Sequence, residues 1–211
     1  MSKRRLVAVI FFCVLVADQA LKIWVKTNMA YGEEFSILGF DWALVHFVEN
    51  NGMAFGLGVG GPYGKLLLTV FRIVTVVLLG AVFLRLLRGE ASRWFLAGFA
   101  LVLAGAIGNI IDSVFYGVIF SASEFHGGPA TFLPPEGGYA PLLHGRVVDM
   151  LYFPLAYGNY PDWLPLVGGR SFVWFSAIFN IADVAINLGV VVLIASVFRG
   201  RRGRDAAVEE E

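Results

Sequence analysis

Four long apolar segments constrain the fold of this chain more than any other feature of its sequence. They cover residues 6–25, 66–87, 94–115 and 172–198. A helix needs about 20 apolar residues to cross the ~30 Å hydrocarbon core of a bilayer, so each segment is long enough to span it. Hydrophobic residues make up 58% of the 211 residues and charged residues only 15%. The chain is therefore more apolar and less charged than a typical soluble domain. We therefore predict one integral membrane domain, residues 1–211, of the membrane α-helical class with four transmembrane helices.

Three clusters of basic residues predict how these helices are oriented. Lys and Arg near the ends of spans accumulate on the cytoplasmic side of a membrane. The clusters precede the first segment, surround the link between the second and third, and follow the fourth: Lys3, Arg4, Arg5; Arg85, Arg88, Arg93; Arg199, Arg201, Arg202 and Arg204. We therefore expect both termini to be cytoplasmic, together with the tail 199–211. Residues 27–65 and 116–171 are then expected to lie outside.

The two regions expected outside carry different patterns. Residues 27–65 contain short alternating or aromatic stretches separated by glycines, which predicts a small β-sheet region after the first helix. The second region contains a Gly- and Pro-rich insertion, residues 121–142, and then a short apolar run, residues 147–153. This run is too brief to span a bilayer and reaches membrane depth only where protein or water satisfies its backbone. Such a placement would bring Asp149 to the fourth helix.

In three of the four apolar segments, acidic, basic and amide side chains recur at helical spacing. They are spaced three or four residues apart, so each set shares one helix face: Asp18 with Lys22, Asn109 with Asp112, and Asn180 with Asp183 and Asn187. An ionisable side chain at membrane depth costs roughly 2.5–3.5 kcal/mol on insertion scales and by default marks a functional site.

Structural contacts between helices are the alternative explanation for these groups. Hydrogen bonds from amide side chains join membrane helices, and this role is sufficient for Asn187 alone. Close helix approach likewise explains Gly105 and Gly108. However, burying acids on three separate helices costs more free energy than helix packing alone would justify. We therefore interpret the set as functional.

Five segments of the chain carry polar residues of this kind. They are Asp18-Gln19-Ala20-Leu21-Lys22, Asn50-Asn51-Gly52-Met53-Ala54-Phe55-Gly56, Gly105-Ala106-Ile107-Gly108-Asn109-Ile110-Ile111-Asp112, Val147-Val148-Asp149 and Phe179-Asn180-Ile181-Ala182-Asp183. In sequence and order they resemble the lipoprotein signal peptidase, or signal peptidase II, family of bacterial intramembrane aspartyl peptidases. The resemblance runs over nearly the full length of the chain.

The resemblance implies an activity and a set of site residues. The family removes signal peptides from prolipoproteins, cutting before a cysteine that bears a diacylglyceryl group, and is associated with the antibiotic globomycin. Its catalytic pair falls on Asp149 and Asp183. The supporting residues fall on Asp18, Lys22, Asn51, Gly52, Asn109, Asp112 and Asn180. The family needs no metal and no cofactor. We expect a monomer in the bacterial inner membrane, in contact with lipids and not with nucleic acid, whose active site faces the periplasm.

The chain departs from the family pattern at two places. The family usually carries Arg directly after the third-helix aspartate, and here that position is Ser113. We expect this change to leave Asp112 short of a partner, and Arg146 is the candidate substitute because a guanidinium can hold a carboxylate in a bidentate grip. The second departure is the insertion 121–142, which places nothing catalytic in doubt.

The chemistry of an aspartate pair can be argued without the family. Two carboxylates about 3 Å apart cannot both ionise, so they share one proton. The ionised member can take a proton from a water molecule while the protonated member polarises the scissile carbonyl. A Ser or Cys nucleophile is not expected, because the three histidines lie in outer segments and Cys13 has none near it in sequence.

Two other classes of protein remain open from the sequence. A small proton-coupled transporter also uses intramembrane acids, although it would be expected to show paired halves and more than four spans. A non-enzymatic assembly factor would explain polar contacts between helices, but it gives no reason for the Asp149 segment.

Overall fold

The computed structural model describes the backbone of residues 1–51, 63–125 and 127–209, with side chains up to residue 199. Within these ranges, four helices are long and apolar enough to cross a membrane. They belong to α1 (Lys3–Asn28), α2 (Gly64–Arg88), α3 (Arg93–Ile111) with its continuation, and α5 (Ile181–Glu209). The continuation of α3 is one π-helical turn, η2 (Asp112–Tyr116), followed by α4 (Gly117–Ile119). The four predicted spans are confirmed as helices.

The fourth span was predicted to begin too early. Helix α5 starts at Ile181, whereas the predicted segment began at residue 172. The intervening residues form strands β5 (Ser171–Trp174) and β6 (Ile178–Phe179). A continuous apolar run does not distinguish a buried strand from a helix, so the boundary had to come from the polar residues that begin α5.

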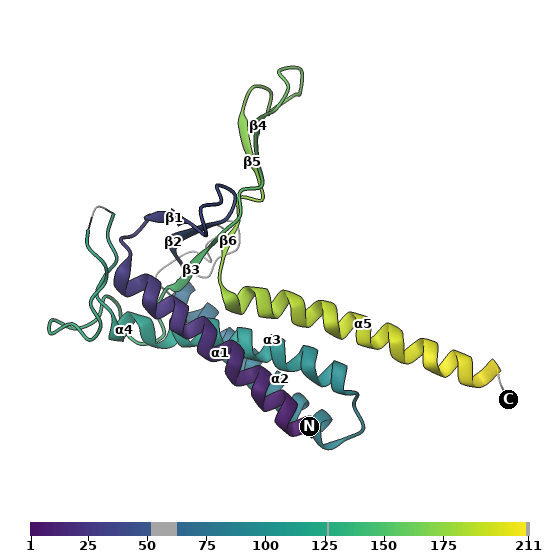
Figure 1. Cartoon of the computed structure of the whole chain (residues 1–211). Coiled ribbons are helices and arrows are strands. Elements are labelled where there is room, and N and C mark those ends of the chain that lie inside the picture. The colour runs from purple at the N-terminus through teal and green to yellow at the C-terminus, as the bar shows by residue number, and fades with distance from the viewer. Residues whose placement is uncertain (52–62, 126, 210–211) are drawn as a thin grey trace.

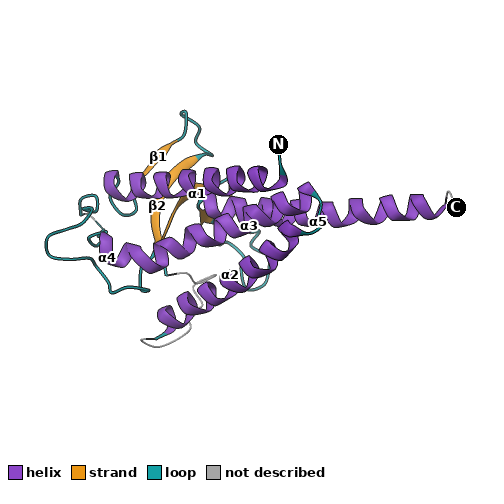
Figure 2. Cartoon of the chain, turned by 90° about the horizontal axis from the view of Figure 1, so that it is seen from below, coloured by secondary structure: helices purple, strands orange, loops and turns teal. Residues whose placement is uncertain are grey.

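Helix α3 is the centre of the bundle and contacts α1, α2 and α5 (Figures 1 and 2). Small residues allow α5 to approach closely. A Cβ atom on Gly98 would lie 2.9 Å from the Gly189 carbonyl oxygen, and one on Gly105 would lie 2.3 Å from the Ala182 oxygen. Glycine is therefore required at these crossings, as expected where membrane helices pack backbone to backbone. The close approach expected at Gly105 is confirmed.

A four-stranded antiparallel sheet covers one end of the bundle (Figure 1). Its strand order is β1 (Glu34–Ser36), β2 (Leu44–Asn50), β3 (Val147–Tyr152) and β6. The sheet predicted after the first helix is confirmed. Strand β3, from the second predicted outer region, and β6, from the start of the predicted fourth span, complete it. The β3 backbone is satisfied by pairing with β2 on one side and β6 on the other. This pairing meets the condition under which the apolar run 147–153 can lie against the helices.

The N-terminus and the α2–α3 link lie at the ends of the helices remote from this sheet, and α5 runs toward the same end (Figures 1 and 2). Strands β4 (Ala156–Asn159) and β5 pair as a hairpin that stands away from the helices (Figure 1). The insertion folds back on the end of α3 and α4, where the Tyr139 N–H donates to the Phe120 oxygen at 3.0 Å. The core beneath the sheet includes Val25, Phe47, Phe120 and Met150.

Candidate active site

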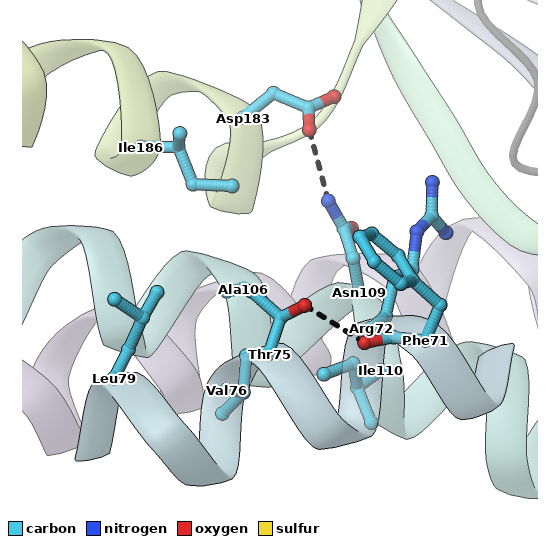
Figure 3. Close-up of a pocket in the computed structure, with 10 residues that line it drawn as sticks. All are labelled: Phe71, Arg72, Thr75, Val76, Leu79, Ala106, Asn109, Ile110, Asp183 and Ile186. Carbon is cyan, nitrogen blue, oxygen red and sulfur yellow. Dashed lines mark hydrogen bonds between the residues drawn. The ribbon is translucent and has the colours of Figure 1, made fainter. Parts of the chain in front are cut away.

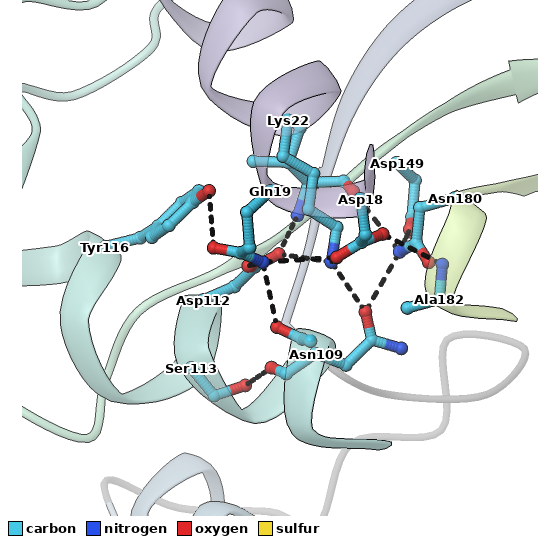
Figure 4. Close-up of polar contacts among 12 residues, drawn as sticks. Asp18, Gln19, Lys22, Asn109, Asp112, Ser113, Tyr116, Asp149, Asn180 and Ala182 are labelled. Atoms are coloured by element: carbon cyan, nitrogen blue, oxygen red, sulfur yellow. Dashed lines mark hydrogen bonds and ion pairs between the residues drawn. The ribbon is translucent and has the colours of Figure 1, made fainter. Parts of the chain in front are cut away.

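The start of helix α5 fixes the position of Asp183. The Asn180 side-chain oxygen accepts a hydrogen bond from the Asp183 N–H at 2.9 Å, and the Asn180 N–H donates to the Asp183 carboxylate at 3.4 Å. This reciprocal pair is a capping box, which satisfies N–H groups that the first turn of a helix leaves without partners. The Ala182 N–H, also in this turn, donates to Asp18 Oδ1 at 2.8 Å (Figure 4). The sequence Asn-Ile-Ala-Asp therefore sets both the helix start and the carboxylate.

Strand β3 places Asp149 beside this helix start. Asp149 is 3% exposed and stands opposite Val48 in the β2–β3 register. The Asn180 side-chain amide donates to Asp149 Oδ1 at 2.6 Å and is also 3.3 Å from the Val148 carbonyl oxygen (Figure 4). Asn180 therefore contacts both aspartates: it caps the helix of one and donates to the carboxylate of the other.

Asn109 joins α3 to the same cluster. Its amide nitrogen donates to Asp183 Oδ1 at 2.9 Å, as Figure 3 shows. Its amide oxygen accepts from Asn180 at 3.1 Å and from Lys22 Nζ at 2.8 Å. Because both ends of the amide are used, the orientation of Asn109 is fixed, and with it one hydrogen bond to the Asp183 carboxylate.

A buried ion triad lies behind these residues. Lys22 Nζ is 2.9 Å from Asp18 Oδ2 and 2.9 Å from Asp112 Oδ2, and none of the three side chains is more than 1% exposed. The pairing of Asp18 with Lys22 that their spacing predicted is confirmed. A buried pair of this kind holds only when further hydrogen bonds satisfy the remaining lone pairs. Here the Val148 N–H donates to Asp112 at 3.1 Å, so the triad connects α1, α3 and β3.

Gln19 and Tyr116 complete the triad, and the sequence reasoning missed both. The Gln19 amide nitrogen lies 3.0 Å from Asp112 Oδ1 and 3.1 Å from Asp18 Oδ2, and the Tyr116 hydroxyl donates to the Gln19 oxygen at 3.2 Å. The sequence offered one signal for Gln19: it is a polar residue directly after Asp18, inside an apolar helix. Gly108 leaves room for the triad, since a Cβ atom there would lie 2.7 Å from Asp18 Oδ2.

The expectation that Arg146 pairs with Asp112 is wrong, as is the expectation that Asp112 lacks a partner. Lys22 supplies the cation for Asp112, and Arg146 Nη1 lies 3.1 Å from Glu49 Oε2 instead. The sheet register explains the difference. Glu49 stands opposite Val148, so Arg146, two residues earlier, is its diagonal neighbour on the same face.

Glu49 is the centre of a second buried cluster that no sequence motif indicated. Its side chain is 1% exposed and pairs with the fully buried Lys26. Lys26 also donates to the Ser123 hydroxyl at 2.9 Å and lies 5.0 Å from the centre of the Tyr139 ring. Both Ser123 and Tyr139 belong to the insertion. The cluster therefore attaches the insertion to α1 and the sheet.

The remaining site residues named from the sequence lie at the edge of this network. Asn51 is exposed just after β2, and its main-chain oxygen accepts from Lys65 Nζ at 3.1 Å. Gly52 lies outside the described residues. Ser113 is buried, and its hydroxyl donates to the Asn109 carbonyl oxygen at 3.0 Å. Over the described residues, no group of three or more His, Cys, Asp or Glu side chains is arranged to hold a metal ion.

The environment of Asp149 favours its protonated form. Burial, and secondarily the negative charge of Asp183, raise the pKa of Asp149 to about 7, although hydrogen bonds from Asn50 and Asn180 oppose the shift. Below about pH 7 Asp149 can therefore hold a proton, as a general acid requires.

A cavity of about 270 Å³ opens beside Asp183, between α2, α3 and α5 (Figure 3). Most of its lining is apolar, and its polar members are Arg72, Thr75, Asn109 and Asp183. A mainly apolar cavity with a few convergent polar groups is typical of a ligand site. Here it ends at one of the two aspartates.

Comparison with known proteins places this arrangement in a family. The family model described as signal peptidase (SPase) II matches residues 10–199. A lipoprotein signal peptidase of Porphyromonas gingivalis is 48% identical over 191 residues, which are 90% of this chain and 81% of the relative. One of Amoebophilus asiaticus is 38% identical over 183 residues, covering 85% of this chain and 72% of the relative.

Solved structures share the fold. A bacterial membrane enzyme determined by the in meso method at 2.3 Å resolution matches with a TM-score of 0.60 at 20% identity, covering 92% of this chain and 87% of that one. A second, at 1.9 Å resolution, matches with a TM-score of 0.59 at 21% identity, covering 90% and 91% of the two chains. Taken together with the match over residues 10–199, these similarities show that the chain belongs to the signal peptidase II family.

Proposed function

We propose that this protein is an aspartyl endopeptidase that removes signal peptides from bacterial prolipoproteins, cleaving before the diacylglyceryl-modified cysteine. The observation that carries the proposal is the shared contact of Asn180 with Asp149 and with the helix start that bears Asp183. One amide there contacts two acid-bearing elements, β3 and α5, and Asp183 lines a mainly apolar cavity. The relatives' common name, lipoprotein signal peptidase, supports the choice of substrate.

The two aspartates divide the acid and base roles according to their surroundings. The raised pKa of Asp149 suits it to hold the shared proton. Asp183, held in place by hydrogen bonds from Asn109 and from the Asn180 N–H, is the second acid of the pair and lines the cavity. Asp183 therefore serves as the general base for the attacking water, and Asp149 serves as the general acid for the scissile carbonyl.

The reaction balances without a covalent enzyme intermediate. Water gives one proton to Asp183 as its oxygen bonds to the carbonyl carbon, and Asp149 gives its proton to the carbonyl oxygen. The resulting tetrahedral diol collapses when one hydroxyl returns a proton to Asp149 and Asp183 protonates the leaving nitrogen. The C–N bond then breaks, and the aspartates are restored to their starting state. No metal or cofactor enters any of these steps.

The basic clusters support a site on the outer side of the inner membrane. The N-terminus and the α2–α3 link lie at the helix ends remote from the sheet, and the C-terminal cluster follows α5 toward the same end (Figure 1). If that end is cytoplasmic, the sheet and both aspartates face the periplasm. We propose that the enzyme acts there as a monomer on a substrate that stays anchored in the bilayer.

The direct test uses purified protein in detergent with a synthetic prolipoprotein peptide that carries a diacylglyceryl cysteine. We expect cleavage before that cysteine by the wild type, inhibition by globomycin, and loss of cleavage in Asp149→Asn and in Asp183→Asn. Asp41→Asn is the matched control, because Asp41 is exposed in a turn before β2. Wild-type cleavage by both site variants would disprove the aspartyl mechanism.

A further inference from the structure

Arg72 brings a positive charge to the cavity beside Asp183. Among the ten described residues that line this cavity, it is the one cation, and Asp183 is the one anion. Figure 3 shows the Arg72 side chain rising from α2 beside Asn109, at the end of the cavity where Asp183 lies. Arg72 is half-buried, and its charge interacts with both Asp183 and Asp149.

Arg72 lies within the apolar part of α2, where placing a cation costs free energy. It lies eight residues after Gly64, or roughly 12 Å along the helix at 1.5 Å per residue. The two other arginines of α2, Arg85 and Arg88, lie in its last turns, where a long side chain can reach the interface. An arginine within a span faces protein or a water-filled cavity and by default marks a function.

The third helix provides no cation at the position where the family resemblance led us to expect one. Ser113 follows Asp112, and its buried hydroxyl is used within its own helix, where it donates to the Asn109 oxygen. Lys22 is held between Asp18 and Asp112. Arg72 therefore brings a cation to the cavity side of the aspartate pair from a different helix.

A peptide segment in this cavity would need hydrogen-bond donors. A chain drawn out for cleavage exposes its carbonyl oxygens, and each one left unpaired in an apolar site costs free energy. Two polar neighbours make hydrogen bonds within the protein: the Thr75 hydroxyl donates to the Phe71 oxygen at 2.8 Å, and the Asn109 amide donates to Asp183 at 2.9 Å. A guanidinium carries five N–H donors in a fixed fork, which makes Arg72 the richest donor in the lining.

We propose that Arg72 is a substrate-binding residue of this enzyme, whose guanidinium donates hydrogen bonds to main-chain carbonyl oxygens of the signal-peptide segment that occupies the α2–α3–α5 cavity. The inference rests on the proposed function and assigns part of substrate recognition to α2.

The test compares Arg72→Met and Arg72→Lys with Arg85→Met as the matched control on the same helix. For the diacylglyceryl peptide, Arg72→Met should raise KM by at least about tenfold, the loss expected for a charge-assisted hydrogen bond. Its kcat should fall much less, because the aspartates are unchanged. Arg72→Lys should recover part of the loss, since it keeps the charge without the fork. Arg85→Met should match the wild type.

A second measurement separates this proposal from the proposed function. Binding of a fluorescent diacylglyceryl peptide is followed by anisotropy in the uncleaving Asp149→Asn background, with and without Arg72→Met. Weaker binding without Arg72 supports the proposal even if the wild type fails to cleave, an outcome that would overturn only the peptidase assignment. Unchanged peptide binding and unchanged KM in a folded Arg72→Met protein would overturn the proposal that Arg72 binds substrate. A shift in the pH profile of kcat at constant KM also overturns it, because Arg72 would then act only as a counter-ion.

Discussion

The side-chain amide of Asn180 donates to the Asp149 carboxylate at 2.6 Å, while its oxygen caps the first turn of α5, which carries Asp183. One amide therefore sets the relative position of two carboxylates that belong to different elements, β3 and α5. Neither carboxylate can shift toward the lipid or the sheet without breaking a bond to Asn180.

Replacing Asn180 by Ala removes both its hydrogen bond to Asp149 and its cap on α5, and should reduce activity far more than stability. We expect kcat to fall by at least about 100-fold, because an error near 1 Å in the placement of reacting groups costs that much. The free energy of unfolding should fall by only about 1–2 kcal/mol, as for a lost N-cap. Cleavage assays and denaturant unfolding in detergent measure the two effects. Asn187→Ala is the control: its exposed amide donates to the Asp183 main-chain oxygen and not to the carboxylate, and near-normal activity is expected.

The pH profile of cleavage should report the proton held by Asp149. Its pKa is raised to about 7, so the protonated form needed as general acid is lost as pH rises through that value. We expect kcat to decline about tenfold per pH unit above the upper apparent pKa. That constant belongs to the pair of acids and is measured by stopped assays across pH 5–9 at saturating peptide. A flat profile up to pH 9 would contradict the role of Asp149.

The same pKa shift predicts the sign of a stability effect. Because the folded state holds the Asp149 proton more tightly than the unfolded state does, the stabilisation is fully present below the ordinary Asp pKa near 4. It is lost as pH rises through about 7. Asp149→Asn, which stays neutral, should therefore lose less stability than the wild type between pH 5 and 8. Thermal unfolding in detergent at matched pH values checks this difference.

Lys22 should be more important to folding than a single ion pair at a surface. In Lys22→Met, Asp18 and Asp112 would face each other in a buried site without their shared cation. Breaking a buried ion pair in this way costs about 3–5 kcal/mol. Adding Asp112→Asn removes one of the two stranded charges and should recover part of the loss. A double variant whose loss equals the sum of the losses in Lys22→Met and in Asp112→Asn would show that these two residues do not interact.

Gly105→Ala tests whether the close approach of α3 and α5 positions the site. The added Cβ atom would lie 2.3 Å from the Ala182 carbonyl oxygen, one residue before Asp183. We expect a loss of about 1–3 kcal/mol from overpacking and a marked fall in kcat as α5 is displaced. Gly80→Ala is the control on α2, where nothing lies within 4 Å, and it should be neutral or stabilise by up to about 1 kcal/mol. Equal behaviour of the two variants would argue against the helix contact.

Most of the architecture was predictable because it depends on patterns within short stretches of the sequence. Apolar length gave the four spans, and glycine-separated aromatic stretches gave the first strands. The i, i+4 spacing of Asp18 and Lys22 predicted their ion pair, which the structure confirms at 2.9 Å. These features depend on local geometry and need no knowledge of which elements meet.

The errors arose where tertiary register decides the outcome. The start of α5 depends on the capping box of Asn180 and Asp183, which an apolar window does not detect. The partner of Arg146 depends on how β3 pairs with β2, and that register was unknown from the sequence. The Lys26–Glu49 pair joins the end of α1 to a strand, so no short motif contains both residues.

The hydrogen bond from the Ala182 N–H to Asp18 spans almost the whole chain, from the first transmembrane helix to the last. It has a consequence for biosynthesis. When α1 enters the membrane, the residues that will complete its polar face have not yet been synthesised, and the charge of Asp18 is balanced only by Lys22 one turn away. Asp183 joins the site only when α5 is inserted. The proposed active site therefore cannot form before the final helix is in place, because α5 supplies both Asp183 and the N–H donor to Asp18.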